Sequence, residues 1–313
     1  MMSNKKEILF LVGPTCTGKS KIAIALLKKY PFEVIYMDAS TVYKNLNIGT
    51  DKPEKEILEK HHHHMVDIVE PDESFNVNSY CKSVEGILDL ILSKGKVPLI
   101  VGGTMMYFNR LLQGIDSLPE RDTMERKFIN YLIVRYSLSA IHSCLKIIDY
   151  DSYKRINVND LQRIERAIEV YLLTGKPMSH FFTKSKSITG KYNPKIVFLF
   201  PQNRDSYHRK IEQRTSKIFN DGLIDEVIDL KKKYQINSKS QSMKSIGYRQ
   251  TMEYLDGNIS EKQLYEKCLY ATRQLAKRQI TWMKKFKADL QIDIDHKPYR
   301  EIIEYIETNL HFP

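Results

Sequence analysis

The sequence predicts an α/β fold: a parallel sheet flanked by helices, with a helical domain inserted into it. Four short apolar runs, EILFLVG, EVIYMD, VPLIVGG and KIVFLFP, each lead into turn residues and are separated by helical patterns. Buried parallel strands joined by crossover helices have this pattern. About ninety residues separate the third run from the fourth, too many for one crossover helix, so we expect an additional domain between them.

Composition is that of a globular protein, with 42% hydrophobic and 28% charged residues among 313. No run approaches the ~18 apolar residues of a membrane helix. The N-terminal apolar run continues directly into a glycine-rich loop, which cleavage of a signal peptide would destroy. We therefore expect a cytoplasmic protein with no membrane partner. Four scattered cysteines without a C-x-x-C pair indicate neither a disulfide framework nor a zinc site.

The charge balance favours a polyanionic partner without naming it. There are 49 basic and 38 acidic residues, a net charge of +11. Nucleic acid is the first such partner to consider. Because the lysines are spread along the whole chain, a merely solubilising surface accounts for the charge equally well.

The loop after the first strand satisfies G-x-x-x-x-G-K-[ST] in full, between a strand and a helix. This context predicts the phosphate-binding loop of a P-loop NTPase-like sheet. Backbone N–H groups turn around phosphate oxygens, Lys19 adds a full charge, and Ser20 is a candidate Mg²⁺ ligand. The motif does not name the reaction, because a transferred γ-phosphate and an expelled diphosphate would both fit.

Two further strand ends carry candidate functional groups. Asp38 follows the second strand, at the edge of the sheet where open α/β folds bind ligands. The third strand runs into Gly102-Gly103-Thr104 and carries no carboxylate. By its residue type alone, Asp38 fits the metal ligand of a kinase and a catalytic base equally well.

We expect residues 1–117 and 193–313 to form the P-loop α/β catalytic core and residues 118–192 to form the inserted helical domain. Within the insert, Asp160 is placed to cap a helix that Gly175 and Pro177 end. Its buried stripe should comprise Leu161, Ile164, Ile168 and Tyr171. The last hundred residues are again helical in pattern. His61–His64 do not predict a metal site, because consecutive imidazoles do not converge on one ion.

Six segments of the chain, in order, carry a family resemblance: DASTVYKNLNIGTDKP (38–53), HHMVDIVEPDESF (63–75), VPLIVGGTMMYFNRLLQG (97–114), INVNDLQRIERAIEVYLLTGKPMS (156–179), SIGYRQTMEYLDG (245–257) and ATRQLAKRQITWMK (271–284). Together with the loop they resemble the tRNA dimethylallyltransferase (IPP transferase) family. The chain looks like the bacterial form, since no C₂H₂ zinc finger follows the core. It departs from many relatives at Ala39, where they have serine, and at Met105 and Met106.

The resemblance implies transfer of a dimethylallyl group from dimethylallyl diphosphate to N6 of adenosine 37 of tRNA, with Mg²⁺. The loop would then grip the departing diphosphate, and no phosphoryl group would move. Asp38 would act as the base, while Lys19, Thr104 and Arg214 would be the other catalytic residues, with Ser20 on the metal. The residues implied to bind the diphosphate are Gly13, Pro14, Thr15, Cys16, Thr17, Gly18, Lys19 and Ser20.

The resemblance also implies contacts with the anticodon stem-loop, by a monomeric enzyme whose inserted domain binds tRNA. The implied tRNA contacts are Asp38, Ala39, Ser40, Thr41, Thr104, Arg126, Gln162, Arg163, Ile164, Glu165, Arg166, Lys244, Ser245, Ile246, Gly247, Tyr248 and Arg249. We also interpret the basic segment 275–287, which contains the single tryptophan, Trp282, as facing RNA.

Three alternatives remain open. A prenyltransferase acting on free adenine nucleotide would need no basic insert. A nucleotide-dependent kinase would turn over ATP and lose that activity in Lys19→Ala. A non-catalytic RNA-binding module would form no product.

Overall fold

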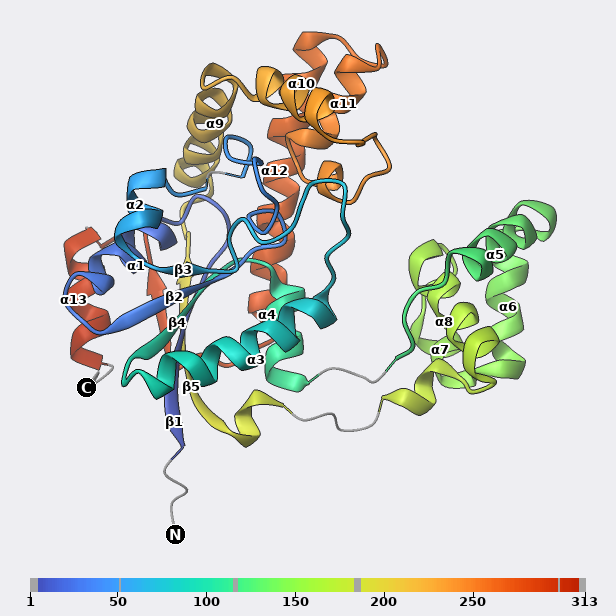
Figure 1. Cartoon of the computed structure of the whole chain (residues 1–313), viewed down its shortest axis with the longest axis horizontal. Coiled ribbons are helices and arrows are strands. Elements are labelled where there is room, and N and C mark those ends of the chain that lie inside the picture. Colours follow the sequence, from blue (N-terminus) through green and yellow to red (C-terminus); the bar gives the residue numbers. More distant parts are fainter. Residues whose placement is uncertain (1–4, 51, 115–117, 183–186, 298, 310–313) are drawn as a thin grey trace. The chain divides into compact units, whose positions relative to one another are not determined.

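The computed structural model describes residues 5–50, 52–114, 118–182, 187–297 and 299–309 (Figure 1). The chain divides into two compact units, one made of Met1–Leu112 with Ile188–Pro313 and the other of Gln113–Ser187. The second unit thus begins and ends slightly earlier than the predicted borders at 118 and 192. No helix in the described ranges is both long and apolar enough to cross a membrane.

The first unit is built on a parallel sheet whose strand order, within the described residues, is β3-β2-β4-β1-β5-β6. The four predicted strands are confirmed as β1 (Lys6–Val12), β2 (Phe32–Met37), β4 (Val97–Gly102) and β5 (Tyr192–Phe200). Two edge strands, β3 (His63–His64) and β6 (Leu290–Asp293), were not expected. Strands this short leave no readable apolar pattern.

The register of the sheet brings three strand ends to one level. Gly102 pairs with Val12 of β1 on one side and with Met37 of β2 on the other. The residues that follow these strands therefore leave the sheet side by side, at the edge where open α/β sheets bind ligands.

Helices cover this sheet in the order expected of a doubly wound fold (Figure 1). They are α1 (Lys19–Leu27), α2 (Lys55–Lys60), α3 (Val77–Ser93), α4 (Met105–Gln113), α9 (Arg204–Asn220), α10 (Leu223–Lys233), α11 (Tyr248–Leu255), α12 (Glu261–Met283) and α13 (Tyr299–Asn309). The predicted helical character of the last hundred residues is confirmed, with β6 as its interruption.

The core of this unit is centred on Phe108 of α4, which is fully buried. Its ring makes edge contacts with Phe10 of β1, Phe198 of β5 and Phe286 after α12, at centroid distances of 5.4, 5.8 and 5.1 Å. Burying one such side chain contributes about 1.5–3 kcal/mol. The cluster therefore ties α4 and the end of α12 to the central strands that carry the candidate site.

The second unit is helical, with α5 (Thr123–Tyr136), α6 (Leu138–Ile148), α7 (Tyr150–Arg155) and α8 (Leu161–Thr174). The predicted helix at 160–177 is confirmed: the Asp160 side chain accepts the Arg163 N–H, and Gly175 ends α8 at φ 67°. The predicted stripe is partly wrong, since Leu161 is 43% exposed while Ala167 and Val170 are buried. Because α8 packs against both α5 and α6, its buried face is broader than one stripe.

Candidate active site

The loop Gly13–Ser20 connects the central strand β1 to α1 and folds over its own carbonyl groups. The Lys19 ammonium and the Thr17 hydroxyl both donate to the Pro14 carbonyl, at 2.6 and 2.8 Å. Gly18 has φ 80°, in the left-handed region that favours glycine, and offers no side chain to cap α1. The loop thus leads straight into the N-terminus of α1, whose positive end favours a bound anion.

Arg214 of α9 reaches this loop, as the resemblance implied. Its guanidinium donates a hydrogen bond to the Thr15 hydroxyl, and it is half-buried. Tyr207 lies on the same helix, α9, and its hydroxyl donates a hydrogen bond to the Thr15 carbonyl at 2.7 Å. Burial raises the pKa of the Tyr207 phenol, so the group keeps the proton that it donates. The resemblance named Arg214 as a catalytic residue, a role that stays a prediction, and did not name Tyr207.

Asp38 and Thr104 lie at the ends of the neighbouring strands β2 and β4. One carboxylate oxygen of Asp38, Oδ1, accepts the N–H groups of Ser40 and Thr41 at 2.8 and 3.4 Å. The Thr104 hydroxyl accepts the N–H of Ala39 at 3.2 Å. These bonds tie the two strand ends together and hold the Asp38 carboxylate at the sheet edge.

A cavity of about 780 Å³ opens where these strand ends meet. This volume lies within the usual range for small-molecule sites. The structure brings to it a large share of the predicted site residues: Thr15, Cys16, Thr17, Gly18, Lys19, Ser20, Asp38, Ser40, Thr41, Arg214, Ile246 and Gly247. Thr104 adjoins the cavity through Gly103, which lines it. The one cavity thus combines the predicted anion loop with a carboxylate.

The cavity offers oxygen groups of the kind that would suit a magnesium ion. Ser20 and Asp38 offer a hydroxyl and a carboxylate, both oxygen ligands of the kind Mg²⁺ prefers. Within the described residues there is no group of three or more histidine, cysteine or acidic side chains able to hold a metal. Mg²⁺ usually takes one or two protein groups together with substrate phosphates, so the sparse set is appropriate.

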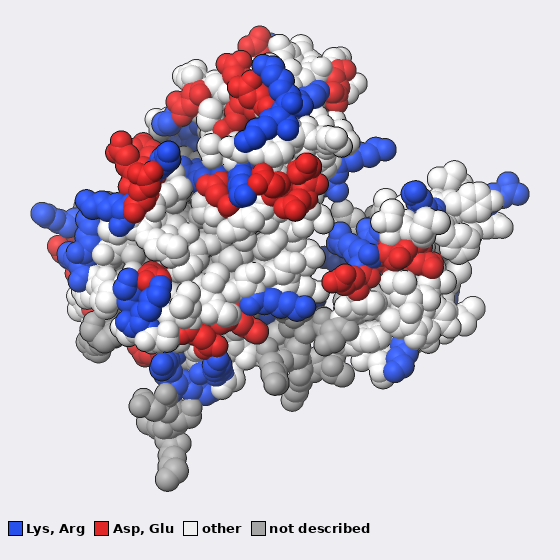
Figure 2. Space-filling model, in the orientation of Figure 1, with Lys and Arg blue, Asp and Glu red and all other residues white. Residues whose placement is uncertain are grey.

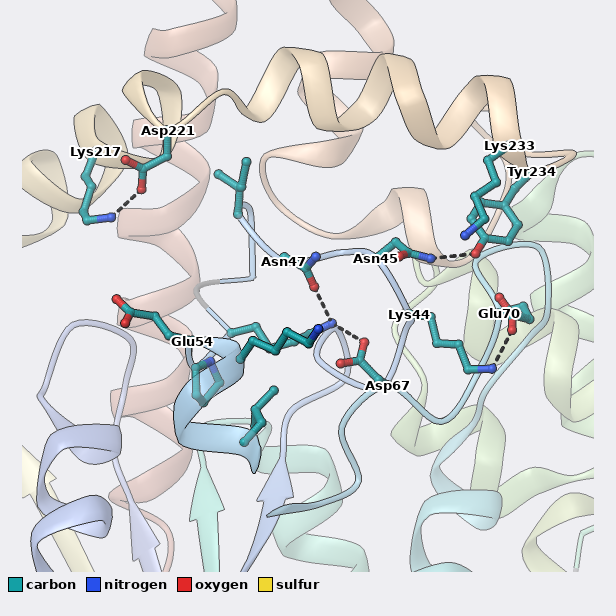
Figure 3. A pocket seen from close by; sticks show the side chains of 15 residues that line it. Lys44, Asn45, Asn47, Glu54, Asp67, Glu70, Lys217, Asp221, Lys233 and Tyr234 are labelled. Atoms are coloured by element: carbon teal, nitrogen blue, oxygen red, sulfur yellow. Dashed lines mark hydrogen bonds and ion pairs between the residues drawn. The ribbon is translucent and has the colours of Figure 1, made fainter. Parts of the chain in front are cut away.

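A second cavity, of about 970 Å³, lies beside the first and shares Lys52, Pro53, Glu54 and Lys217 with it (Figure 3). Carboxylates engage most of its lysines, while the Lys233 ammonium lies 5.1 Å from the ring centroid of Tyr234. Lys44 is paired with Glu70, and Lys217 with Asp221. A wall of neutralised pairs does not favour a multiply charged anion, whereas the Gly13–Ser20 loop does. Of the two cavities, the one at the loop therefore has the better chemistry for an anion.

Lys52 supports the wall between the two cavities, and sequence reasoning missed it. Its side chain is 2% exposed and donates to Asp67, to the Asn47 amide oxygen and to the Tyr43 carbonyl, at 2.6, 3.1 and 2.9 Å. Burial lowers the pKa of Lys52, and the bond with Asp67 opposes that effect. A buried ammonium satisfied by three acceptors fixes residues 43–50, several of which line one or the other cavity.

In the helical unit, the predicted RNA-contact arginines belong to an ion-pair network. The carboxylate of Glu169 is 0% exposed and accepts from Arg126 at 2.8 Å and from Arg166 at 2.6 Å. Arg126 also pairs with Glu165 at 3.1 Å. Burial would raise the pKa of Glu169, but these arginines hold it below its usual value. The network joins α5 to α8 and fixes how both guanidinium groups are presented.

Two predicted tRNA contacts need correction. Ile164 and Tyr248 are both 0% exposed. Ile164 packs in the core of the helical unit, and the Tyr248 hydroxyl donates to Glu226 at 2.5 Å. Their side chains thus support the fold rather than reach a ligand. Glu165 is also buried, whereas Gln162, Arg163, Lys244 and Arg249 are exposed.

The basic end of α12 has the exposure expected of an RNA-facing surface. Lys277, Arg278 and Lys284 are exposed. The ammonium of Lys285 lies 5.6 Å from the ring centroid of Trp282. Such a pair of cation and aromatic ring can take part in stacking with a base.

Comparison with known proteins agrees with this geometry. A family model described as IPP transferase matches residues 41–286, and one described as isopentenyl transferase matches residues 6–70. A tRNA dimethylallyltransferase from Nitrosomonas europaea is 37% identical over 301 residues, covering 96% of this chain and 95% of that protein.

Two crystal structures are similar over nearly the whole chain. A tRNA isopentenylpyrophosphate transferase from Bacillus halodurans has a TM-score of 0.70 at 30% identity, covering 97% of this chain and 95% of that one. A tRNA delta(2)-isopentenylpyrophosphate transferase from Staphylococcus epidermidis has a TM-score of 0.69 at 31% identity, covering 97% and 98%. With the loop, the strand-end carboxylate and the arginine in one cavity, and with a family model over more than half of its length, the chain belongs to the IPP transferase family.

Proposed function

We propose that this protein transfers a dimethylallyl group from dimethylallyl diphosphate to the N6 amine of adenosine 37 of a tRNA, releasing diphosphate. The observation that carries the proposal is the meeting of an anion loop and a carboxylate in one cavity, at the level ends of β1, β2 and β4. The first would hold the donor and the second the acceptor. The name carried by the similar Nitrosomonas protein supports both the group transferred and the tRNA substrate.

The Gly13–Ser20 loop holds the diphosphate in this proposal. Negative charge grows on the diphosphate as the allylic C–O bond breaks. The ammonium of Lys19, the N-terminal end of α1 and the guanidinium of Arg214 would stabilise that charge. Removing one donor of this kind from a preorganised site typically costs about 10²–10³ in kcat. Mg²⁺ bound through Ser20 and the phosphate oxygens would supply further charge neutralisation.

Asp38 receives the proton from the attacking amine. The exocyclic amine of adenine is a poor nucleophile, because its lone pair is delocalised into the ring. Oδ1 of Asp38 accepts the N–H groups of Ser40 and Thr41. The other carboxylate oxygen, Oδ2, would orient the amine and take its proton as the N–C bond forms. The Thr104 hydroxyl accepts the N–H of Ala39, the residue after Asp38, and would help to hold this carboxylate in place.

The acceptor base has to leave its stack to reach this cavity. Extruding a base from an RNA loop costs a few kcal/mol, which pocket contacts recover. Exposed basic groups of α12 and of the helical unit would hold the RNA backbone meanwhile. We propose a monomer, which light scattering of the purified chain would check.

The direct test is incubation of the purified protein with Mg²⁺, dimethylallyl diphosphate and unmodified tRNA, followed by nucleoside analysis. N6-isopentenyladenosine should form, and Lys19→Met should lower kcat about 10²–10³-fold. Chelation of Mg²⁺ should lower the rate, and added Mg²⁺ should restore it. Lys28→Met, an exposed lysine just past the C-terminal end of α1, is the matched control and should leave the rate unchanged.

Three outcomes would reject the proposal. Product formed with AMP but not with tRNA would indicate a nucleotide prenyltransferase. ATP turnover that saturates with an acceptor would indicate a kinase. Binding of tRNA with no product from an active preparation would indicate an RNA-binding module.

A further inference from the structure

Gln279 of α12 connects two segments of the candidate site. Its amide oxygen accepts the Thr15 N–H at 3.1 Å, and its amide NH₂ donates to the Gly103 carbonyl at 2.8 Å. The side chain is buried and lines the cavity. The two partners fix the orientation of the amide, because a backbone N–H can only donate and a carbonyl can only accept.

The surroundings of Gln279 leave little freedom to either segment. All three polar groups of Thr15 are held: its N–H by Gln279, its carbonyl by Tyr207 and its hydroxyl by Arg214. A Cβ on Gly103 would lie 2.5 Å from the Gln279 amide nitrogen and 2.7 Å from the Gly13 carbonyl. Only glycine permits this approach, so the contact is built into the backbone on both sides.

Further hydrogen bonds connect Gly103 to the end of β2, where Asp38 lies. Thr104 follows Gly103, its N–H donates to the Met37 carbonyl at 3.3 Å, and its hydroxyl accepts the Ala39 N–H at 3.2 Å. Ala39 is adjacent to Asp38. One buried amide thus stands between the anion loop and the strand end that carries the carboxylate.

We propose that Gln279 is a positioning residue that fixes the spacing between the diphosphate loop and the acceptor-facing residues Thr104 and Asp38. This role rests on the proposed function. Gln279 does not act on the reacting atoms, but it holds both segments to one side chain. A displacement of about 1 Å between reacting groups can cost 10²-fold in rate, so the effect should fall on kcat.

The test is the rate of prenyl transfer by Gln279→Ala and by the near-isosteric Gln279→Met. We expect kcat to fall about 10- to 100-fold in both. Binding of inorganic diphosphate, measured by calorimetry, should change less than about threefold, because Lys19 and the remaining loop amides are intact. Gln279→Glu keeps the acceptor for Thr15 and loses the donor to Gly103, so it should not restore the rate.

Two comparisons separate positioning from a loss of folding. Gln274→Ala removes a half-buried amide from the same helix and should leave kcat unchanged. In a double-mutant cycle, Gln279→Ala combined with Thr104→Ala should lose less than the product of the two single losses, because one effect acts through the other.

The inference is overturned if the Gln279 variants keep the wild-type kcat, or if the double variant shows the simple product. It is also overturned if diphosphate binding falls in parallel with kcat. A wild-type protein without prenyl transfer would instead reject the proposed function, and the inference with it.

Discussion

At the scale of single residues, the two carboxylates at opposite ends of β2 have distinct tasks. Asp38 lies at the carboxyl end of β2 and is partly exposed to the cavity. Glu33 lies near the opposite end of the same strand, where it is 4% exposed. It accepts from Lys96 at 2.8 Å and from the His64 ring nitrogen at 3.0 Å. The first carboxylate is available to a ligand, whereas the second is committed to the fold.

The lowered pKa of Glu33 predicts how the stability of the protein depends on pH. Burial would raise the pKa, but the hydrogen bonds from Lys96 and His64 lower it from 4.5 to about 2. A depressed pKa contributes stability that is present above the unfolded value and lost as pH falls through the folded one. At pH 7, Glu33→Gln should therefore lose up to about 3 kcal/mol, and the difference from wild type should shrink between pH 4.5 and 2.

Thermal unfolding of the two proteins at several pH values measures this difference. Glu85→Gln, an exposed glutamate on α3, serves as the control. A gap between wild type and Glu33→Gln that stays constant down to the lowest pH would contradict the assignment.

At the scale of elements, the segment 43–50 depends on contacts from distant helices. The Glu226 carboxylate of α10 accepts the N–H groups of Asn47 and Ile48 at 3.0 and 2.9 Å. Tyr248 of α11 accepts the Gly49 N–H at 3.1 Å and donates to Glu226. One carboxylate therefore holds successive amides of a segment that lines both cavities.

Removing this contact should loosen the segment without unfolding the sheet. We expect Glu226→Ala to speed hydrogen exchange at the amides of Asn47 and Ile48 by about tenfold or more, since a lost bond to a charged acceptor costs about 1.5–3 kcal/mol. Prenyl transfer should fall with it. The exposed neighbour Asp225→Ala is the matched control, and unchanged exchange at both amides would disprove the role of Glu226.

At the scale of the whole molecule, the basic residues are spread along the whole sequence rather than gathered in one segment. Figure 2 shows Lys and Arg side chains interspersed with Asp and Glu on the face drawn. Part of this charge is neutralised in pairs such as Lys44–Glu70 and Lys191–Asp89. Net charge alone was therefore a weak guide to the partner, as the sequence suggested.

Salt dependence should still distinguish the two substrates. RNA contacts span many phosphates and release many counterions, whereas the donor carries one diphosphate. We expect tRNA affinity to fall steeply with salt concentration and donor affinity to fall much less. Affinity is measured by filter binding for tRNA and by calorimetry for the donor, at salt concentrations from about 50 to 300 mM. The slope of log affinity against log salt concentration is then compared for the two substrates. Equal slopes would contradict the proposal.

Much of the fold could be predicted because it rests on local patterns. The four long strands, the Gly13–Ser20 loop and the helix capped by Asp160 each bear their signal within a dozen or so residues. The edge strands were missed because they are two and four residues long. The exposure of Leu161 was missed because the width of a buried face depends on how many neighbours pack on the helix, which its own sequence does not specify.

The sequence by itself determined the sheet, the anion loop and the residues at its strand ends, because backbone preferences and apolar spacing act between near neighbours. Only the tertiary structure decided which distant side chains hold that site together. Gln279 lies 264 positions from Thr15, and Glu226 lies 178 from Ile48. Such hydrogen bonds form only in the folded chain, where packing offsets the entropy lost in closing those long loops. No local sequence pattern therefore predicts them.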